Sequence, residues 1–169
     1  GNDLLDVAVR AYEHAVTSMV KRHPAVFYGV SAASCRWLGH FGIKARGVLG
    51  NSIDAEAFRA QSSGRDFRAE LGLPEDALVV AFAGRFIPEK GIRPLMEAAA
   101  RLSDEGCIFF LLAGDGPLGE EIAARALPNV KTVGRLGPSD VSALMASADV
   151  FCLPTRSEGF STSLLECAA

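Results

Sequence analysis

The sequence has little that marks a nucleic-acid-binding, membrane-spanning or disordered chain. Its 17 Lys and Arg are outnumbered by 20 Asp and Glu, so the net charge is -3 and the pI is about 5.6. Composition therefore gives no sign of a basic surface for nucleic acid. No apolar run approaches the ~18 residues that a membrane span needs. Hydrophobic residues at 49% and charged residues at 22% are typical of a globular chain.

Clusters that would hold a metal or a set of disulfides are also missing from the sequence. His14, His23 and His40 are scattered, and none pairs with a cysteine or a carboxylate at ligand spacing. We therefore expect no metal site. No two cysteines lie within the spacing of a metal clip, and we expect buried free thiols in a reducing, cytoplasmic compartment. The four are Cys35, Cys107, Cys152 and Cys167.

The two ends of the chain do not look like the natural ends of a domain. The length of 169 residues suits about one domain. However, the chain starts at Gly1 with no Met, and Ala169 falls within what the pattern predicts are the first turns of a helix. We therefore expect a fragment of a larger protein.

The first third of the chain pairs helices with short strands. An apolar stripe at helical spacing predicts a helix over 3–21. Ser31 is placed to cap a second helix that ends near Gly42. Short strands are expected at 25–30 and 43–49.

From Ala77 onward the pattern becomes regular, after a polar connector over 54–76 with one short helix at 65–71. Apolar strands are expected at 77–83, 107–113, 130–133 and 149–153. Helices are expected at 92–102, at 118–126, at 139–145 with Ser139 as the cap, and from about Ser161. Apolar strands that alternate with helices predict a mainly parallel sheet covered on both faces. The fold class is therefore α/β, a Rossmann-like three-layer α/β/α arrangement.

Candidate binding residues follow the ends of the predicted strands, which is where ligands bind on such sheets. Gly84, Arg85 and Lys90 come after the first apolar strand. A glycine lets the backbone approach a ligand, and two cations this close can flank a diphosphate. The alternative is a solvated polar turn.

A glycine motif follows the second apolar strand. Residues 114–119 read Gly-Asp-Gly-Pro-Leu-Gly, which is formally the G-x-G-x-x-G of dinucleotide-binding folds. That motif calls for an acidic residue about 20 positions on, where this chain has Arg135. An arginine could serve the 2′-phosphate of NADP, so an NADP-dependent oxidoreductase using Gly114–Gly119 stays open. The other alternative is a tight turn with a proline at the first helical position.

A third group of candidates follows the last predicted strand. Gly159, Phe160, Ser161 and Thr162 precede or open a helix, whose unpaired N–H groups would suit a phosphate. Carboxylates lie on either side of this segment. They are Glu158 and Glu166. The alternatives are an exposed loop carboxylate for the first, and for the second a capping box that begins at Ser163.

Taken together, these motifs resemble a known family. The order is G-R-x4-K-G over 84–91, G-D-G-P over 114–117, and E-G-F-S-T-S-L-L-E over 158–166. It resembles the C-terminal donor half of the retaining GT-B glycosyltransferases of group 1, family four. The segment 50–54 is similar to that family's N-G-V-D hinge, although Ser52 replaces its glycine. Ser161 likewise stands where glycine is frequent.

The resemblance implies a role for each candidate residue. Arg85 and Lys90 would grip the diphosphate, Glu158 would contact the donor sugar, and Glu166 would bind the ribose hydroxyls. The first three form the expected catalytic group. Gly84, Gly114 and Gly116 would also bind the donor. Arg135 and Leu136 would lie beside the base, and the phosphates would be bound by Gly159, Phe160, Ser161 and Thr162. The resemblance implies no cofactor and no metal.

The resemblance also implies a division of the chain. Residues 1–50 would be the tail of an N-terminal acceptor domain and a hinge, and residues 51–169 a donor-binding domain truncated at its C-terminus. The parent enzyme would transfer a sugar from a nucleotide-diphosphate sugar to a glycan or lipid acceptor of cell-envelope polysaccharide. The parent enzyme would work in the cytoplasm, and peripheral association with the inner face of the membrane is an alternative. It would use no nucleic acid. This part alone would be inactive. A non-catalytic nucleotide-binding module remains an alternative.

Overall fold

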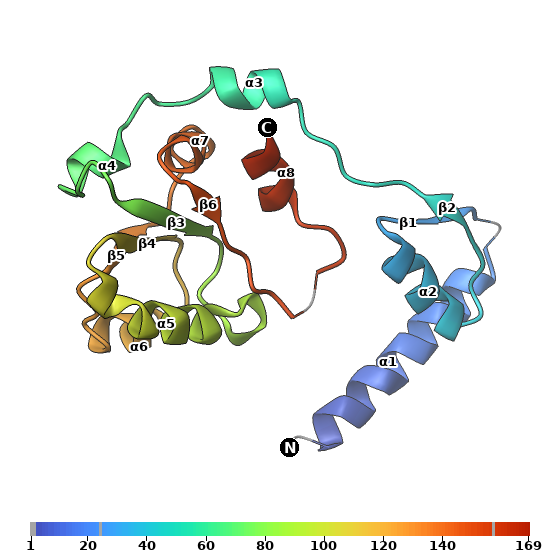
Figure 1. Ribbon diagram of the computed structural model, residues 1–169. Coiled ribbons are helices and arrows are strands. Elements are labelled where there is room, and N and C mark those ends of the chain that lie inside the picture. The colour runs from blue at the N-terminus through green and yellow to red at the C-terminus, as the bar shows by residue number, and fades with distance from the viewer. Residues whose placement is uncertain (1–2, 24, 157) are drawn as a thin grey trace. The chain divides into compact units, whose positions relative to one another are not determined.

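The computed structural model describes residues 3–23, 25–156 and 158–169 (Figure 1). The chain divides into two compact units, Gly1–Asn51 and Ser52–Ala169. Each unit is described by itself. Across the described residues, no helix combines the length and the apolar character needed to cross a bilayer.

The first unit is built around two short parallel strands. Its elements are α1 (Asp3–Lys21), β1 (Phe27–Gly29), α2 (Ala32–His40) and β2 (Ala45–Val48), with β1 parallel to β2. The Ser31 hydroxyl accepts a hydrogen bond from the Ser34 N–H at 3.1 Å, which confirms the predicted cap. Gly42 follows α2 with φ of +65°, as expected of a residue that closes a helix. Both strands are shorter than predicted.

The first unit buries little of its apolar surface. Within residues 7–23 and 25–51, only Gly29 and Ile43 are buried. Large apolar side chains on its helices and strands are exposed instead, including Tyr12, Met19, Trp37 and Val48. A two-stranded sheet of this kind is at best marginally stable by itself in water.

The second unit is organised by a four-stranded parallel sheet in the order β5-β4-β3-β6. Its strands are β3 (Leu78–Ala83), β4 (Ile108–Ala113), β5 (Val130–Gly134) and β6 (Val150–Phe151). This confirms the predicted parallel sheet. The first strand of the sheet, β3, lies between β4 and β6, so the strand order reverses there. The carboxyl ends of β3 and β6 are therefore the point where such sheets bind ligands.

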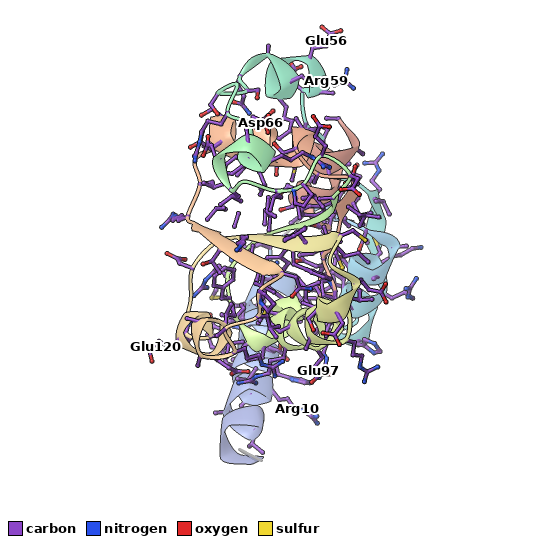
Figure 2. The ribbon with its side chains drawn as sticks, turned by 60° about the vertical axis from the view of Figure 1, so that its left-hand side comes forward. Arg10, Glu56, Arg59, Asp66, Glu97 and Glu120 are labelled. Atoms are coloured by element: carbon purple, nitrogen blue, oxygen red, sulfur yellow. The ribbon has the colours of Figure 1, made fainter. Side chains whose placement is uncertain are left out.

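Helices cover both faces of this sheet, which confirms the three-layer fold (Figure 1). They are α3 (Ala55–Ala60), α4 (Phe67–Glu70), α5 (Ile92–Arg101), α6 (Gly119–Ala124), α7 (Pro138–Ala146) and α8 (Thr162–Ala168), with short 3₁₀ turns η1 (Pro88–Lys90) and η2 (Ser103–Glu105). One core packs α5 and α6 against Phe82 and Leu112, and the other packs α4 and α7 against Val79 and Leu111. Exposed carboxylates such as Glu97 and Glu120 point away from the sheet (Figure 2).

A network around Arg68 joins the amino ends of β3 and β6. The guanidinium donates to the Ala77 and Ser147 carbonyls, both at 2.8 Å, and forms an ion pair with Asp149 at 2.6 Å. Asp149 also accepts from the Val79 N–H at 2.7 Å. That backbone N–H, and then Arg68, hold the pKa of Asp149 below its ordinary value. Because β6 has only two residues, few backbone hydrogen bonds join it to β3. The side-chain hydrogen bonds of this network supplement them.

Three local predictions about helices were wrong. The predicted connector contains α3, which Asp54 caps by accepting from the Ala57 N–H at 2.9 Å. The helix α7 begins at Pro138 after Gly137, so Ser139 is not its cap; a proline needs no N–H partner in the first turn. Because α8 begins at Thr162, Ser163 lies inside it and opens no capping box.

The prediction that all four cysteines are buried was also wrong. All four are free thiols, but Cys107 and Cys167 are exposed and the other two are half-buried. Cys107 directly precedes β4. Burial raises the pKa of the Cys152 thiol.

Candidate functional site

The loop after β3 is tied to the loop after β4. The Phe86 N–H donates to the Asp115 carbonyl at 2.7 Å, and the Phe86 carbonyl accepts from the Leu118 N–H at 3.0 Å. The Phe86 ring is buried and lies 6.2 Å from the Phe82 ring, between centroids. The two loops therefore form one rigid support at the carboxyl ends of β3 and β4.

The glycines after β4 are explained by this contact between loops. A Cβ at Gly114 would lie 1.9 Å from the Gly84 carbonyl oxygen, and one at Gly116 would lie 2.7 Å from the Phe86 carbonyl oxygen. Both glycines also have positive φ, +142° and +148°. The packing of one loop on another thus requires the first two glycines of the motif, and a dinucleotide is not needed to account for them.

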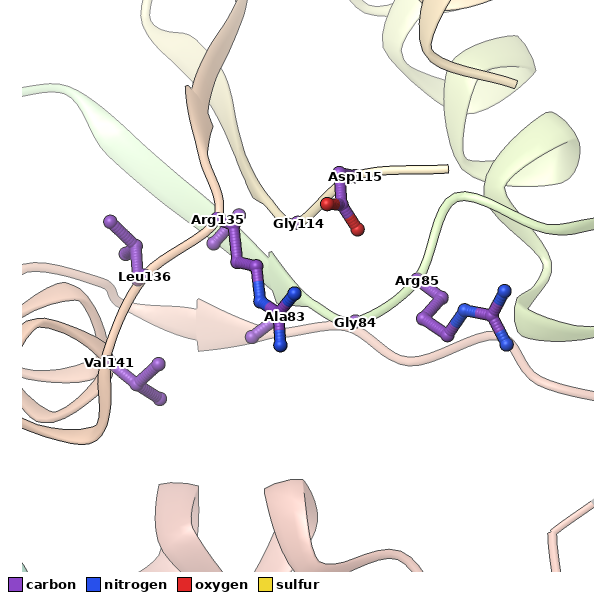
Figure 3. A pocket seen from close by; sticks show the side chains of 9 residues that line it. Ala83, Gly84, Arg85, Gly114, Asp115, Arg135, Leu136 and Val141 are labelled. Atoms are coloured by element: carbon purple, nitrogen blue, oxygen red, sulfur yellow. The ribbon is translucent and has the colours of Figure 1, made fainter. Parts of the chain in front are cut away.

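A cavity of about 350 Å³ lies over these loops, at the carboxyl ends of β3, β4 and β5. Five predicted site residues line it: Gly84, Arg85, Gly114, Arg135 and Leu136. Figure 3 shows the Arg135 side chain reaching from the end of β5 toward Ala83 and Gly84. One part of the lining is apolar and another is charged.

Val141 and Asp115 were not predicted from the sequence. One belongs to the apolar part of the lining and the other to the charged part. Val141, on α7, extends the apolar part beside Leu136, and no local signal pointed to it because the fold brings it there. Asp115 adds a carboxylate to the charged part of the lining. Its place inside the Gly-Asp-Gly motif was the signal that could have found it.

The loop after β6 docks on the 3₁₀ turn that follows β3. The Glu89 carbonyl accepts from the Thr155 hydroxyl and from the Arg156 N–H, both at 3.0 Å. Gly91 has φ of +73°, and a Cβ there would lie 1.9 Å from the Pro154 carbonyl oxygen. Only glycine fits this approach, so the two loops interlock where the strand order reverses.

An ion pair joins the same two loops. The Lys90 ammonium binds the Glu158 carboxylate, and the two side chains are 29% and 23% exposed. The structure thus brings together two residues that lie 68 positions apart in the sequence. Among the ion pairs of the described residues none involves Arg85, whose side chain is exposed beside the cavity.

The remaining predicted residues lie on the segment that leads into α8. Gly159, Phe160 and Thr162 are exposed and Ser161 is half-buried. Glu166 lies elsewhere. It lines a second cavity of about 290 Å³ together with Arg59 and Ser142, so the structure does not bring it to the first cavity. Across the described part of the chain, no three His, Cys, Asp or Glu residues gather in a metal-binding group.

Comparison with known proteins shows what this arrangement is similar to. The family described as glycosyl transferases group 1 matches residues 77–169, more than half of the chain. The putative glycosyltransferase EpsF of Bacillus subtilis is 36% identical over 127 residues, which cover 72% of this chain and 33% of EpsF. The alpha-D-kanosaminyltransferase of Streptomyces kanamyceticus is 35% identical over 121 residues, which cover 68% of this chain and 30% of that enzyme. The chain spans about a third of the length of these curated relatives.

Solved structures share the fold. Anabaena HepE, crystallised with UDP and glucose, superposes with a TM-score of 0.72 at 24% identity, over 90% of this chain and 44% of HepE. WaaG, a glycosyltransferase involved in lipopolysaccharide biosynthesis, gives a TM-score of 0.64 at 22% identity, over 84% of this chain and 40% of WaaG. The NADP-dependent oxidoreductase hypothesis is not favoured by these relatives. The chain belongs to the group 1 glycosyl transferases and has the Rossmann-like fold of one half of their GT-B architecture.

Proposed function

We propose that this chain carries the nucleotide-sugar donor site of a retaining glycosyltransferase of family four. The observation that supports it best is the cavity at the carboxyl ends of the strands, with its arginines and its apolar part. Ligands of parallel α/β sheets bind at this end, and a nucleoside diphosphate needs both cations and an apolar surface. The site residues proposed are those that the resemblance implies.

In this proposal each part of the donor has its own neighbours. The base lies against Leu136, Val141 and the Arg135 guanidinium, because a planar cation stacks on an aromatic ring. The diphosphate lies over Gly84, where no side chain intervenes, and takes its charge partners from Arg85 and Lys90. When the sugar leaves, negative charge grows on the departing diphosphate, and fixed cations stabilise it. Glu158 faces the sugar. We propose that this chemistry needs no metal.

The division of the chain is part of the same proposal. Residues 51–169 would form the donor-binding domain, and residues 1–50 the tail of the acceptor domain and a hinge. The exposed apolar side chains and the lone strand pair of the first unit support this, because such surface is normally covered by further strands and helices. The chain alone would bind donor without transferring sugar.

The acceptor proposed is a glycan or lipid of the cell envelope, glycosylated on the cytoplasmic side of the membrane. The support comes from the names of relatives. TuaC of Bacillus subtilis, 33% identical over 123 residues, is described as a putative teichuronic acid biosynthesis glycosyltransferase.

Isothermal titration calorimetry of the chain with UDP, GDP, ADP and NADPH, in the absence of metal, tests the proposal. We expect one of the three diphosphates to bind with a dissociation constant below about 1 mM, which corresponds to about -4 kcal/mol. Binding of NADPH alone, or of none of the four by a folded chain, would overturn it.

An arginine variant locates the binding. Arg85→Ala should lower the affinity for the diphosphate by about tenfold, because it removes a charge-assisted contact of roughly 1.4 kcal/mol. The matched control is Arg101→Ala, an exposed arginine at the end of α5. Equal affinities of the two variants would remove Arg85 from the site. In the complete enzyme, the same substitution should lower transfer activity by orders of magnitude.

A further inference from the structure

Lys90 and Glu158 are both assigned to the donor, yet they bind each other. The inference below rests on the proposed function. Their ion pair is partly buried, with side-chain exposures of 29% and 23%. Partial burial reduces the screening that makes fully exposed pairs worth little. A ligand that uses Lys90 must therefore displace Glu158 or share the lysine with it.

The backbone holds the two residues in position to meet. Glu89, next to Lys90, accepts the hydrogen bonds from Thr155 and Arg156 on the loop that carries Glu158. On the other side of Lys90, Gly91 allows the approach of the Pro154 carbonyl. These docked loops hold the backbones of Lys90 and Glu158 close enough for the two side chains to pair.

The two cations of the site are therefore in different states. Arg85 lines the cavity and belongs to none of the ion pairs of the described residues, so a phosphate reaches it without displacing a carboxylate. Lys90 is engaged with Glu158. A phosphate that takes the lysine leaves a partly buried carboxylate without its partner, and such a group is costly until it finds another donor.

We propose that Glu158 makes the site discriminate between a nucleotide-diphosphate sugar and the bare nucleoside diphosphate. The hydroxyl groups of the donor sugar replace Lys90 as hydrogen-bond donors to the Glu158 carboxylate, and the lysine is released to the phosphates. A bare diphosphate offers no hydroxyl to Glu158, so the ion pair competes with it. After transfer the sugar is gone, Glu158 recaptures Lys90, and the product diphosphate leaves more readily. Glu158 thereby acts as a positioning residue for Lys90 and sets specificity.

Titration of the chain and of Glu158→Gln with the diphosphate that binds best, and with its glucose conjugate, tests this. Glutamine keeps the shape and removes the charge, so the variant should bind the bare diphosphate about fivefold more tightly, the equivalent of a pair worth ~1 kcal/mol. The preference for the sugar conjugate should fall. Glu89→Gln is the matched control, because it removes a charge from the neighbouring exposed side chain and leaves the pair intact. Its effect should be less than twofold.

A second background separates this role from simple repulsion between Glu158 and the phosphates. In Lys90→Met, the further change Glu158→Gln should leave the affinity for the bare diphosphate unchanged, since the competition acts through the lysine. Equal tightening with and without Lys90, or no tightening in Glu158→Gln itself, would overturn the inference while leaving the proposed function intact. Failure of the unaltered chain and of every variant to bind any diphosphate would overturn both. Circular dichroism confirms that each variant is folded.

Discussion

Two ion pairs join the β3 side of the sheet to the β6 side, one at each end of the strands. At the amino ends, Arg68 and Asp149 meet within a network that also uses two carbonyls and the Val79 N–H. At the carboxyl ends, Lys90 and Glu158 meet between two loops. The first pair is surrounded by fixed backbone partners, and the second lies where α/β sheets bind ligands. Under the proposed function, similar charges would serve stability at one end and ligand binding at the other.

The largest effect is expected from Gly91→Ala, which would separate the two loops at the carboxyl ends. The added Cβ would lie 1.9 Å from the Pro154 carbonyl, at a φ of +73° that alanine rarely adopts. We expect a loss of about 3 kcal/mol in the free energy of unfolding together with a loss of nucleotide binding. Urea unfolding and titration measure the two losses. Gly64→Ala, also at positive φ but in open space, is the control for backbone strain alone.

A smaller loss of stability, without loss of binding, is expected from Arg68→Ala. The variant loses hydrogen bonds to two carbonyls and to Asp149, and we expect about 2 kcal/mol in the free energy of unfolding. Its affinity for the nucleotide should stay within about twofold of that of the unaltered chain, a change in binding free energy below ~0.4 kcal/mol. Arg101→Ala controls for the removal of an arginine. Weakened nucleotide binding in a folded Arg68→Ala chain would break the division between the two ends.

The reverse pattern is expected from Lys90→Met. The affinity for the sugar conjugate should fall by about tenfold, because a phosphate loses a cation. The free energy of unfolding should change by no more than about 1 kcal/mol, as for other partly exposed pairs. If Lys90→Met loses stability and keeps full affinity, the pair of Lys90 and Glu158 serves stability, as the pair at the amino ends does, and the comparison fails.

The smallest effect is a dependence of stability on pH at the amino ends. The pKa of Asp149 is lowered in the folded chain, first by the Val79 N–H and then by Arg68. A lowered pKa contributes stability that is present above the unfolded value of about 3.9 and is lost as the pH falls through the folded value. The free energies of unfolding of the unaltered chain and of Asp149→Asn should therefore converge as the pH is lowered below about 4. Parallel curves would show that Asp149 does not contribute.

Much of the fold could be predicted from the sequence, because its signals are local. The strands β3 and β4 are continuous apolar runs, and each ends one residue before a glycine. From a parallel sheet it follows that residues such as Gly84 and Gly114 lie at one end, and the structure places both on the same cavity. The short β6 was predicted too long, since apolar character continues beyond the two residues that pair with β3.

The contacts between distant segments could not be predicted. Arg68 and Asp149 lie 81 positions apart, and neither belongs to a recognisable pattern. The pairing of Lys90 with Glu158 depends on how Gly91 lets two loops meet, which no spacing encodes. Glu166 shows the same limit, because the course of α8 decides which cavity it lines.

The most direct test of the account is to map where a nucleoside diphosphate binds on the chain, by ¹H–¹⁵N NMR during titration with UDP, GDP or ADP. The account predicts that the largest shifts arise from the amides of Gly84, Arg85, Gly114 and Arg135, with smaller ones at Lys90 and Glu158. Shifts concentrated at the amino ends of the strands, around Arg68, would contradict it.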